Sequence, residues 1–88
     1  MFVIRYANEE HQISSYEDAS IKWRKYIRIN GLGSRDIMED PKIYYYHSNT
    51  KAYHLVAHVS YNGKVWSGDR YISGQHPLFS PSKEGIAA

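Results

Sequence analysis

The dipeptide Asn62-Gly63, set between two runs of alternating apolar and polar residues, is the feature that most constrains the fold of this chain. Asn-Gly favours a two-residue type I′ turn, because both residues tolerate positive φ and the twist of that turn matches the twist of paired strands. We therefore predict a β-hairpin with strands at 52–61 and 64–72.

The same turn fixes the register of the hairpin, and with it the two faces of the sheet. We predict that Val59 lies opposite Trp66 on the face beneath a helix, and that His58 lies opposite Ser67 on the outer face. A further strand is expected at 43–47, after a loop. The outer face would then also hold His54, Tyr71, Ile43, Tyr45 and His47, while the helix side would hold Tyr44 and Tyr46.

The first thirty residues predict a strand or a short hairpin followed by one helix. Alternation over 2–6 indicates a strand, and 11–13 is long enough to return beside it. Ser14 and Glu17 form a capping-box pattern that begins a helix, and Asn30-Gly31 suits its end. At 100° per residue, one helix face should pack on the sheet, formed by Tyr16, Ala19, Trp23, Tyr26 and Ile27.

These elements give the order β(β)αβββ, which is an α+β fold with an antiparallel sheet of three to five strands and one helix across a face. The chain has 88 residues, enough for one small core and one domain. We place that domain at 1–73 and expect an irregular tail at 74–88. The segment 31–41, bounded by glycines and a proline, predicts a loop with room for one helical turn.

The composition excludes several classes of protein. With no cysteine, the chain has no disulfide framework, thiolate zinc site or thiol nucleophile. Its apolar runs are too short to span a bilayer, and its first residues lack the features of a secretory leader, so we expect a cytoplasmic protein without membrane contact. Gly31-Leu32-Gly33 follows a helix rather than a strand, and is no phosphate loop. We predict no cofactor.

The predicted outer face contains the residue types of two kinds of chemical site, a metal site and a catalytic triad. His54 and His58 are four residues apart in one strand, roughly 13 Å, which is too far to share a metal ion, so we predict no metal site. His58, Ser67 and Asp69 have the residue types of a catalytic triad. An open sheet face offers them neither an oxyanion hole nor a cleft, however, and we predict that the protein is not an enzyme.

Two surfaces are predicted to bind a partner. Four cations within seven helical residues lie away from the packing face, with Ile21 among them as an apolar anchor; a merely solvated face is the alternative. The second surface is the aromatic and imidazole set of the outer sheet face, although most of the nine tyrosines could instead fill the core. The predicted binding residues are Lys22, Arg24, Lys25, Arg28, Tyr45, His54, His58 and Tyr71.

Over about residues 2–72 the chain resembles the compact accessory proteins of bacteriophages and mobile elements, among them anti-CRISPR proteins. The resemblance lies in the short first hairpin, the Ser-Tyr-Glu-Asp-Ala helix start, the Gly-Leu-Gly break and the terminal Val-Ser-Tyr-Asn-Gly-Lys-Val-Trp hairpin. It implies a phage inhibitor that binds a bacterial protein or nucleoprotein complex, such as a CRISPR effector, and blocks nucleic-acid loading or nuclease recruitment. It transfers no functional residue.

The alternative function is a small nucleic-acid-binding domain that uses the same basic helix face and the same Tyr/His face. A double-stranded-RNA-binding domain has the order helix, three strands, helix, and no basic helix follows Ile72 here.

Overall fold

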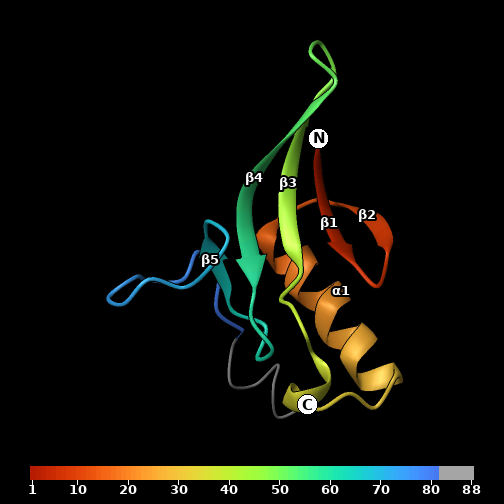
Figure 1. Cartoon of the computed structure of the whole chain (residues 1–88), viewed down its shortest axis with the longest axis vertical. Coiled ribbons are helices and arrows are strands. Elements are labelled where there is room, and N and C mark those ends of the chain that lie inside the picture. The colour runs from red at the N-terminus through yellow and green to blue at the C-terminus, as the bar shows by residue number, and fades with distance from the viewer. Residues whose placement is uncertain (82–88) are drawn as a thin grey trace.

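The computed structural model describes residues 1–81, which form one antiparallel sheet with the strand order β2-β1-β3-β4-β5 and a single helix, α1, across one face (Figure 1). The predicted α+β class and the order β(β)αβββ are confirmed. A short 3₁₀ helix, Ser34–Asp36, provides the helical turn expected in the connecting loop. The other elements are β1 Phe2–Tyr6, β2 Glu9–Ile13, α1 Tyr16–Ile29, β3 Lys42–His47, β4 Ala52–Val59 and β5 Val65–Ser67.

The first hairpin, between β1 and β2, turns through two residues. Tyr6 pairs with Glu9, and the two residues between them, Ala7 and Asn8, have φ of 53° and 60°. Positive φ at both central positions defines a type I′ turn. The return strand β2 therefore begins at Glu9, two residues earlier than the sequence indicated. Ala7, which carries a Cβ, adopts the left-handed backbone conformation that favours glycine.

α1 begins one residue later than predicted. Ser15, rather than Ser14, is the N-cap, and its hydroxyl accepts a hydrogen bond from the Asp18 amide at 2.9 Å. Asp18 in turn accepts from the Ser14 amide at 2.9 Å and from Lys22 Nζ at 2.8 Å. Ser14-Glu17 and Ser15-Asp18 are overlapping patterns of the same kind, and the second is used. The hydrogen bonds from Lys22 and from the Ser14 amide hold the pKa of Asp18 below its usual range.

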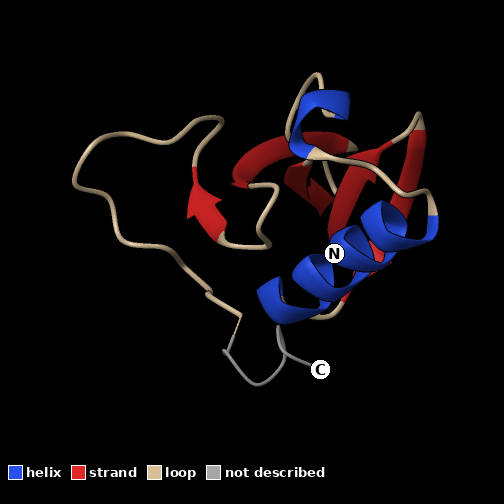
Figure 2. Cartoon of the chain, turned by 90° about the horizontal axis from the view of Figure 1, so that it is seen from below, coloured by secondary structure: helices blue, strands red, loops and turns tan. Residues whose placement is uncertain are grey.

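The core lies between α1 and the sheet face that it covers. Ala19, Trp23 and Ile27 are buried, and Tyr16 and Tyr26 pack against them, so the predicted packing face of the helix is confirmed. The helix ends at Asn30 as expected, with Gly31 at φ 61°. The sheet contributes Ile4, Ile13, Ile43, Ala57, Val59 and Val65. Figure 2 shows α1 running along this face while the segment that follows β5 loops away from it.

The Asn62-Gly63 turn differs from the prediction by one residue. Gly63 N donates to Ser60 O and Ser60 N donates to Lys64 O, both at 2.9 Å, so three residues form the loop and only Gly63 (φ 89°) has positive φ. This is a type I turn followed by a glycine bulge. Val59 pairs with Val65, and His58 pairs with Trp66.

That one-residue shift exchanges the faces of β5. Val65 enters the core, and Trp66 occupies the outer face beside His58, the reverse of the predicted arrangement. β5 also ends at Ser67 rather than Ile72, because Gly68 (φ 82°) turns the chain away and donates its amide to Val56 O. Phe79 later returns to pair with Val65 and packs against the core.

A β-bulge in β4 produces the second difference. Ile43 pairs with Ala57 and Tyr44 pairs with Leu55, which leaves Val56 as an extra residue whose side chain also packs on the core. Alternation along β4 is therefore interrupted. Ile43 lies in the core rather than on the outer face, and the predicted faces of Tyr44, Tyr45, Tyr46 and His47 are each reversed.

The hairpin of β3 and β4 extends well past the helix and past the N-terminus (Figure 1). Its turn spans residues 48–51, as predicted. The predicted division into a domain at 1–73 and a tail stays a prediction, and tail residues 82–88 lie outside the described residues. No helix within residues 1–81 is long and apolar enough to cross a bilayer.

Candidate functional site

The basic cluster of α1 is partly engaged in internal contacts. Lys22 forms an ion pair with Asp18 at 2.8 Å. Arg24 donates from Nε to Ser20 O at 3.4 Å, and its side chain lies against the Gly63 backbone. Lys25 and Arg28 are exposed, and neither forms an ion pair within the described chain. Of the four predicted binding cations, two are therefore fully available, next to Ile21 at 49% exposure.

The second predicted surface is divided between the two sides of the sheet. Tyr45 contacts Phe2 with ring centroids 5.0 Å apart, and His54 contacts His47 at 4.8 Å, on the helix side of the sheet. His58 is on the outer side, where it lines a groove together with Tyr71. The four side chains therefore do not form one surface, because the Val56 bulge separates the faces of His54 and His58.

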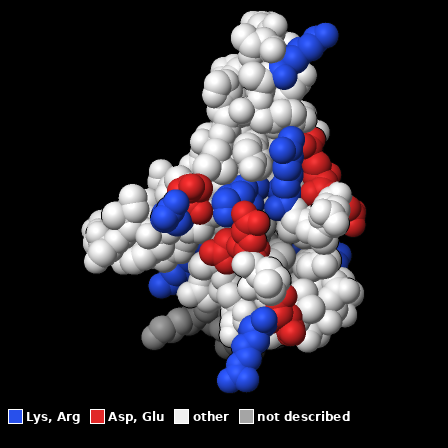
Figure 3. All heavy atoms as spheres, viewed as in Figure 1, with Lys and Arg blue, Asp and Glu red and all other residues white. Residues whose placement is uncertain are grey.

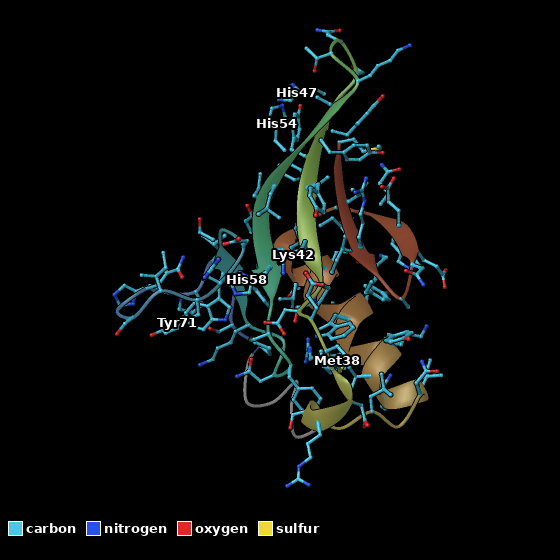
Figure 4. All side chains as sticks on the ribbon, in the orientation of Figure 1. Met38, Lys42, His47, His54, His58 and Tyr71 are labelled. Atoms are coloured by element: carbon cyan, nitrogen blue, oxygen red, sulfur yellow. The ribbon has the colours of Figure 1, made fainter. Side chains whose placement is uncertain are left out.

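One row of side chains crosses the outer face at the level of Lys42. Strand pairing places Arg5 beside Lys42, Lys42 beside His58, and His58 beside Trp66, with Glu10 next to Arg5 at the other end. Neighbouring strands are about 4.8 Å apart, so the row spans the sheet. Figure 4 shows Lys42 and His58 at the lower ends of β3 and β4, and Tyr71 on the loop beyond them. We call these five residues the outer row.

His58 is the most buried member of the outer row, at 1% exposure. Its Nδ1 is 2.9 Å from Gly68 O. A carbonyl only accepts, so we assign the proton of the neutral ring to Nδ1, which leaves the Nε2 lone pair as an acceptor. The groove beside it holds about 520 Å³ and is lined also by Asp40, Lys42, Ser60, Asn62, Trp66, Asp69, Arg70 and Tyr71. The expectation that His58 is exposed on the outer face is wrong, whereas its contact with a partner stays a prediction.

The possible triad of His58, Ser67 and Asp69 is not assembled in the structure. Ser67 pairs with Ala57 of the core face, whereas His58 pairs with Trp66 on the outer face. His58 and Ser67 are therefore on opposite sides of the sheet, because the hairpin register differs from the predicted one by one residue.

Arg5 is the main residue that sequence reasoning missed. Its guanidinium lies 4.7 Å from the ring centroid of Tyr44 and 4.2 Å from that of Tyr53, and its Nε donates to Glu10 at 3.0 Å. Tyr53 also donates to Glu10, at 3.3 Å. The hydrogen bond with Glu10 raises the pKa of Arg5. The predicted register had placed Tyr44 beneath the helix, so its contact with Arg5 on the outer face could not be anticipated.

A second groove, of about 650 Å³, lies between the β1–β2 hairpin, α1 and the loop 32–42, and shares Asp40 and Lys42 with the His58 groove. It is lined by five carboxylates and two cations. We call it the acidic groove. Its carboxylates are Glu9, Glu10, Asp36, Glu39 and Asp40, and its cations are Arg5 and Lys42.

Most cations of the outer face have a carboxylate within ion-pair distance. Arg5 pairs with Glu10 at 3.0 Å, Lys42 with Glu39 at 3.4 Å, and Arg70 with Asp69 at 3.7 Å. In Figure 3, basic and acidic side chains are correspondingly interleaved across the middle of the visible face. The surface is therefore of mixed charge rather than a basic stripe.

Within residues 1–81, no three His, Cys, Asp or Glu side chains are grouped so that they could hold a metal ion.

No protein-family model, no curated protein and no solved structure matches this chain.

Proposed function

We propose that the protein is a non-enzymatic binding protein that docks through its outer face on a bacterial protein or nucleoprotein complex. The observation that carries this proposal is the pairing of Arg5, Lys42 and Arg70 with carboxylates in a surface that also contains aromatic rings. A surface that binds nucleic acid gains its affinity from cations free to neutralise phosphates. Tyr, Trp and Arg, which this surface presents at Tyr71, Trp66 and Arg70, are the residue types enriched at protein–protein interfaces.

The anti-CRISPR resemblance gives this binding function a specific form, which stays a prediction. In that form, the protein is encoded by a phage, acts in the cytoplasm of the bacterial host and inhibits an effector complex by occupying one of its surfaces. The two adjoining grooves share Lys42 and Asp40, so one bound partner can contact both.

The test is affinity capture from a bacterial lysate with two charge-reversal variants. Arg70→Glu with Tyr71→Ala alters the exposed rim of the His58 groove. Lys25→Glu with Arg28→Glu reverses two charges at the exposed end of the helix, against one in the first variant, and serves as the control. The proposal expects capture to be lost with the first variant and kept with the second. Capture that is unchanged by the first, in a protein with a native circular dichroism spectrum, would rule the outer face out.

A direct nucleic-acid-binding function has one observation in its favour, which is the exposed pair Lys25 and Arg28 beside Ile21. Labelled single- and double-stranded oligonucleotides titrated at two salt concentrations separate the two functions. Binding without any protein partner, weakened by salt and by the helix variant, would support this alternative. The outer-face proposal expects no such binding.

A further inference from the structure

We propose that the acidic groove is the docking site for a basic segment of the partner, in which Lys or Arg side chains flank an apolar side chain. The proposal rests on the protein-binding function proposed above and specifies the chemistry of the bound segment. The bound segment is expected to be positively charged. The basic face of the helix had instead indicated an acidic or phosphate-bearing partner.

The charges of the groove are the first argument. Both cations are already paired, Arg5 with Glu10 and Lys42 with Glu39. Three carboxylates are left without a Lys or Arg partner among the described residues, namely Glu9, Asp36 and Asp40. Partly enclosed charges of one sign attract a partner of the opposite sign and disfavour one of the same sign. A cationic segment fits here, and a nucleic-acid backbone does not.

The apolar parts of the groove are the second argument. Met38 is 96% exposed on the loop that forms one wall, and in Figure 4 it lies below the sheet, in front of α1 in that view. Tyr6, Trp23 and Tyr26 form another wall, with ring centroids 5.0–5.8 Å apart. A flexible exposed methionine beside aromatic rings can pack on an apolar side chain, and ring faces also attract Lys and Arg.

The unsatisfied donor of Trp23 is the third argument, and it is independent of the charges. Trp23 is 2% exposed, lines the groove, and has the one buried side-chain nitrogen or oxygen without a hydrogen-bond partner among residues 1–81. A buried donor without an acceptor is unfavourable. Nε1 is itself covered, so a backbone carbonyl of a polypeptide bound in the groove accepts from it once the side chains over the indole move aside.

The groove walls come from segments that can adjust to a ligand. The loop 32–42 is held at its start by Asp36, which accepts from the Gly33 amide at 2.7 Å, and at its end by β3. Met38, between these anchors, makes almost no contact with the rest of the protein. Binding can therefore reposition this side chain without disturbing the core.

The test is a titration with two ten-residue peptides, one of alternating Arg and Leu and one of alternating Glu and Leu. Trp66→Phe serves as the background, so that the fluorescence reports Trp23. We expect the basic peptide to change this emission and the acidic peptide to leave it unchanged. We expect Glu9→Gln with Asp40→Asn to weaken binding of the basic peptide about fivefold at low salt.

The matched control compares single variants: Glu17→Gln, which removes one charge outside both grooves, should leave binding unchanged, whereas Glu9→Gln alone should weaken it. Equal weakening by both variants, or equal binding of both peptides, would overturn the proposal. Self-association that only the groove variant abolishes would assign the groove to a second copy of the chain, and would also overturn it. If the peptide fails while capture still depends on Arg70 and Tyr71, the proposed function stands and this inference alone falls.

Discussion

Gly63 is the point at which the β4–β5 turn contacts α1, and Gly63→Ala tests that contact. A Cβ built on Gly63 would lie 2.7 Å from Arg24 Cδ and 2.9 Å from both Arg24 Nε and Ser20 Oγ. The residue also has a φ of 89°, which an L-residue adopts with strain. Its carbonyl accepts a buried hydrogen bond from Ser20 Oγ at 2.6 Å, so the turn cannot move away without breaking that bond.

Gly68→Ala provides a matched control for the size of the stability loss expected of Gly63→Ala. It has a similar φ of 82°, but a Cβ there would meet no heavy atom within 4 Å. Gly68→Ala should therefore show the backbone strain alone, roughly 1–2 kcal/mol. Gly63→Ala should add overpacking of roughly 1–3 kcal/mol, so that its total loss of unfolding free energy is about 2–5 kcal/mol.

Urea denaturation, followed by tryptophan fluorescence and circular dichroism, measures both losses. Each kcal/mol corresponds to roughly 4–8 °C in Tm for a domain of this size. In the double variant, Arg24→Ala should relieve part of the Gly63→Ala loss, since it removes two of the three clashing atoms. Equal losses for Gly63→Ala and Gly68→Ala would refute the proposed contact between the turn and the helix.

Three further predictions concern other elements of the fold. Ala7→Gly should stabilise the protein by roughly 0.5–1 kcal/mol in thermal melts, because it removes a Cβ from a left-handed position. His58→Ala should lower the unfolding free energy by about 2–4 kcal/mol in urea, since it opens a cavity and leaves Gly68 O without its partner. Asp18→Asn should lower it by about 1 kcal/mol at pH 7. The pKa of Asp18 is lowered in the folded state, so the stability it contributes is present above the unfolded pKa and is lost as pH falls through the folded one.

Each of these has an outcome that would contradict it. Ala52 does not have a positive φ, so Ala52→Gly should destabilise the protein. If Ala7→Gly destabilises the protein as well, the assignment of a type I′ turn at Ala7 and Asn8 is wrong. A neutral effect of His58→Ala would mean that the ring is exposed, as the sequence had suggested. A loss from Asp18→Asn that persists unchanged once the pH has fallen below the lowered pKa of the folded state would exclude an electrostatic origin, because the wild-type carboxyl is protonated there as well.

Local patterns in the sequence sufficed for the elements of the fold. Periodicity identified the first strand and the packing face of the helix, and Asn30-Gly31 identified the helix end, because each depends on neighbouring residues alone. The faces of the sheet depend instead on register. Register was wrong at two places, the Val56 bulge and the Gly63 turn, and each shifted the strand residues beyond it. Consequently, the sequence identified some residues of the candidate site, but not which of them lie side by side.

The bulge could not be inferred because Val56 looks like an ordinary strand residue. It is β-branched and follows Leu55, and nothing in the run from Ala52 to Val59 marks an extra position. What selects the bulge is the core. Val56 packs against the core beside the buried Ala57, while Leu55, which pairs with Tyr44, is 40% exposed. Burying two adjacent β4 residues requires an interruption of the strand period, and only the packed structure shows that both are needed.

Ser20 gives a physical reason why Asn62-Gly63 does not form the two-residue turn. Ser20 is fully buried on the helix, and its hydroxyl is satisfied by Gly63 O in the observed three-residue turn. In the two-residue register, Trp66 would replace Val65 opposite Val59, where the core accommodates two fully buried valines. Tertiary packing therefore outweighs the local preference of the dipeptide. The same choice places Trp66 next to His58 on the outer face, so one contact between helix and turn determines both the core and the proposed binding surface.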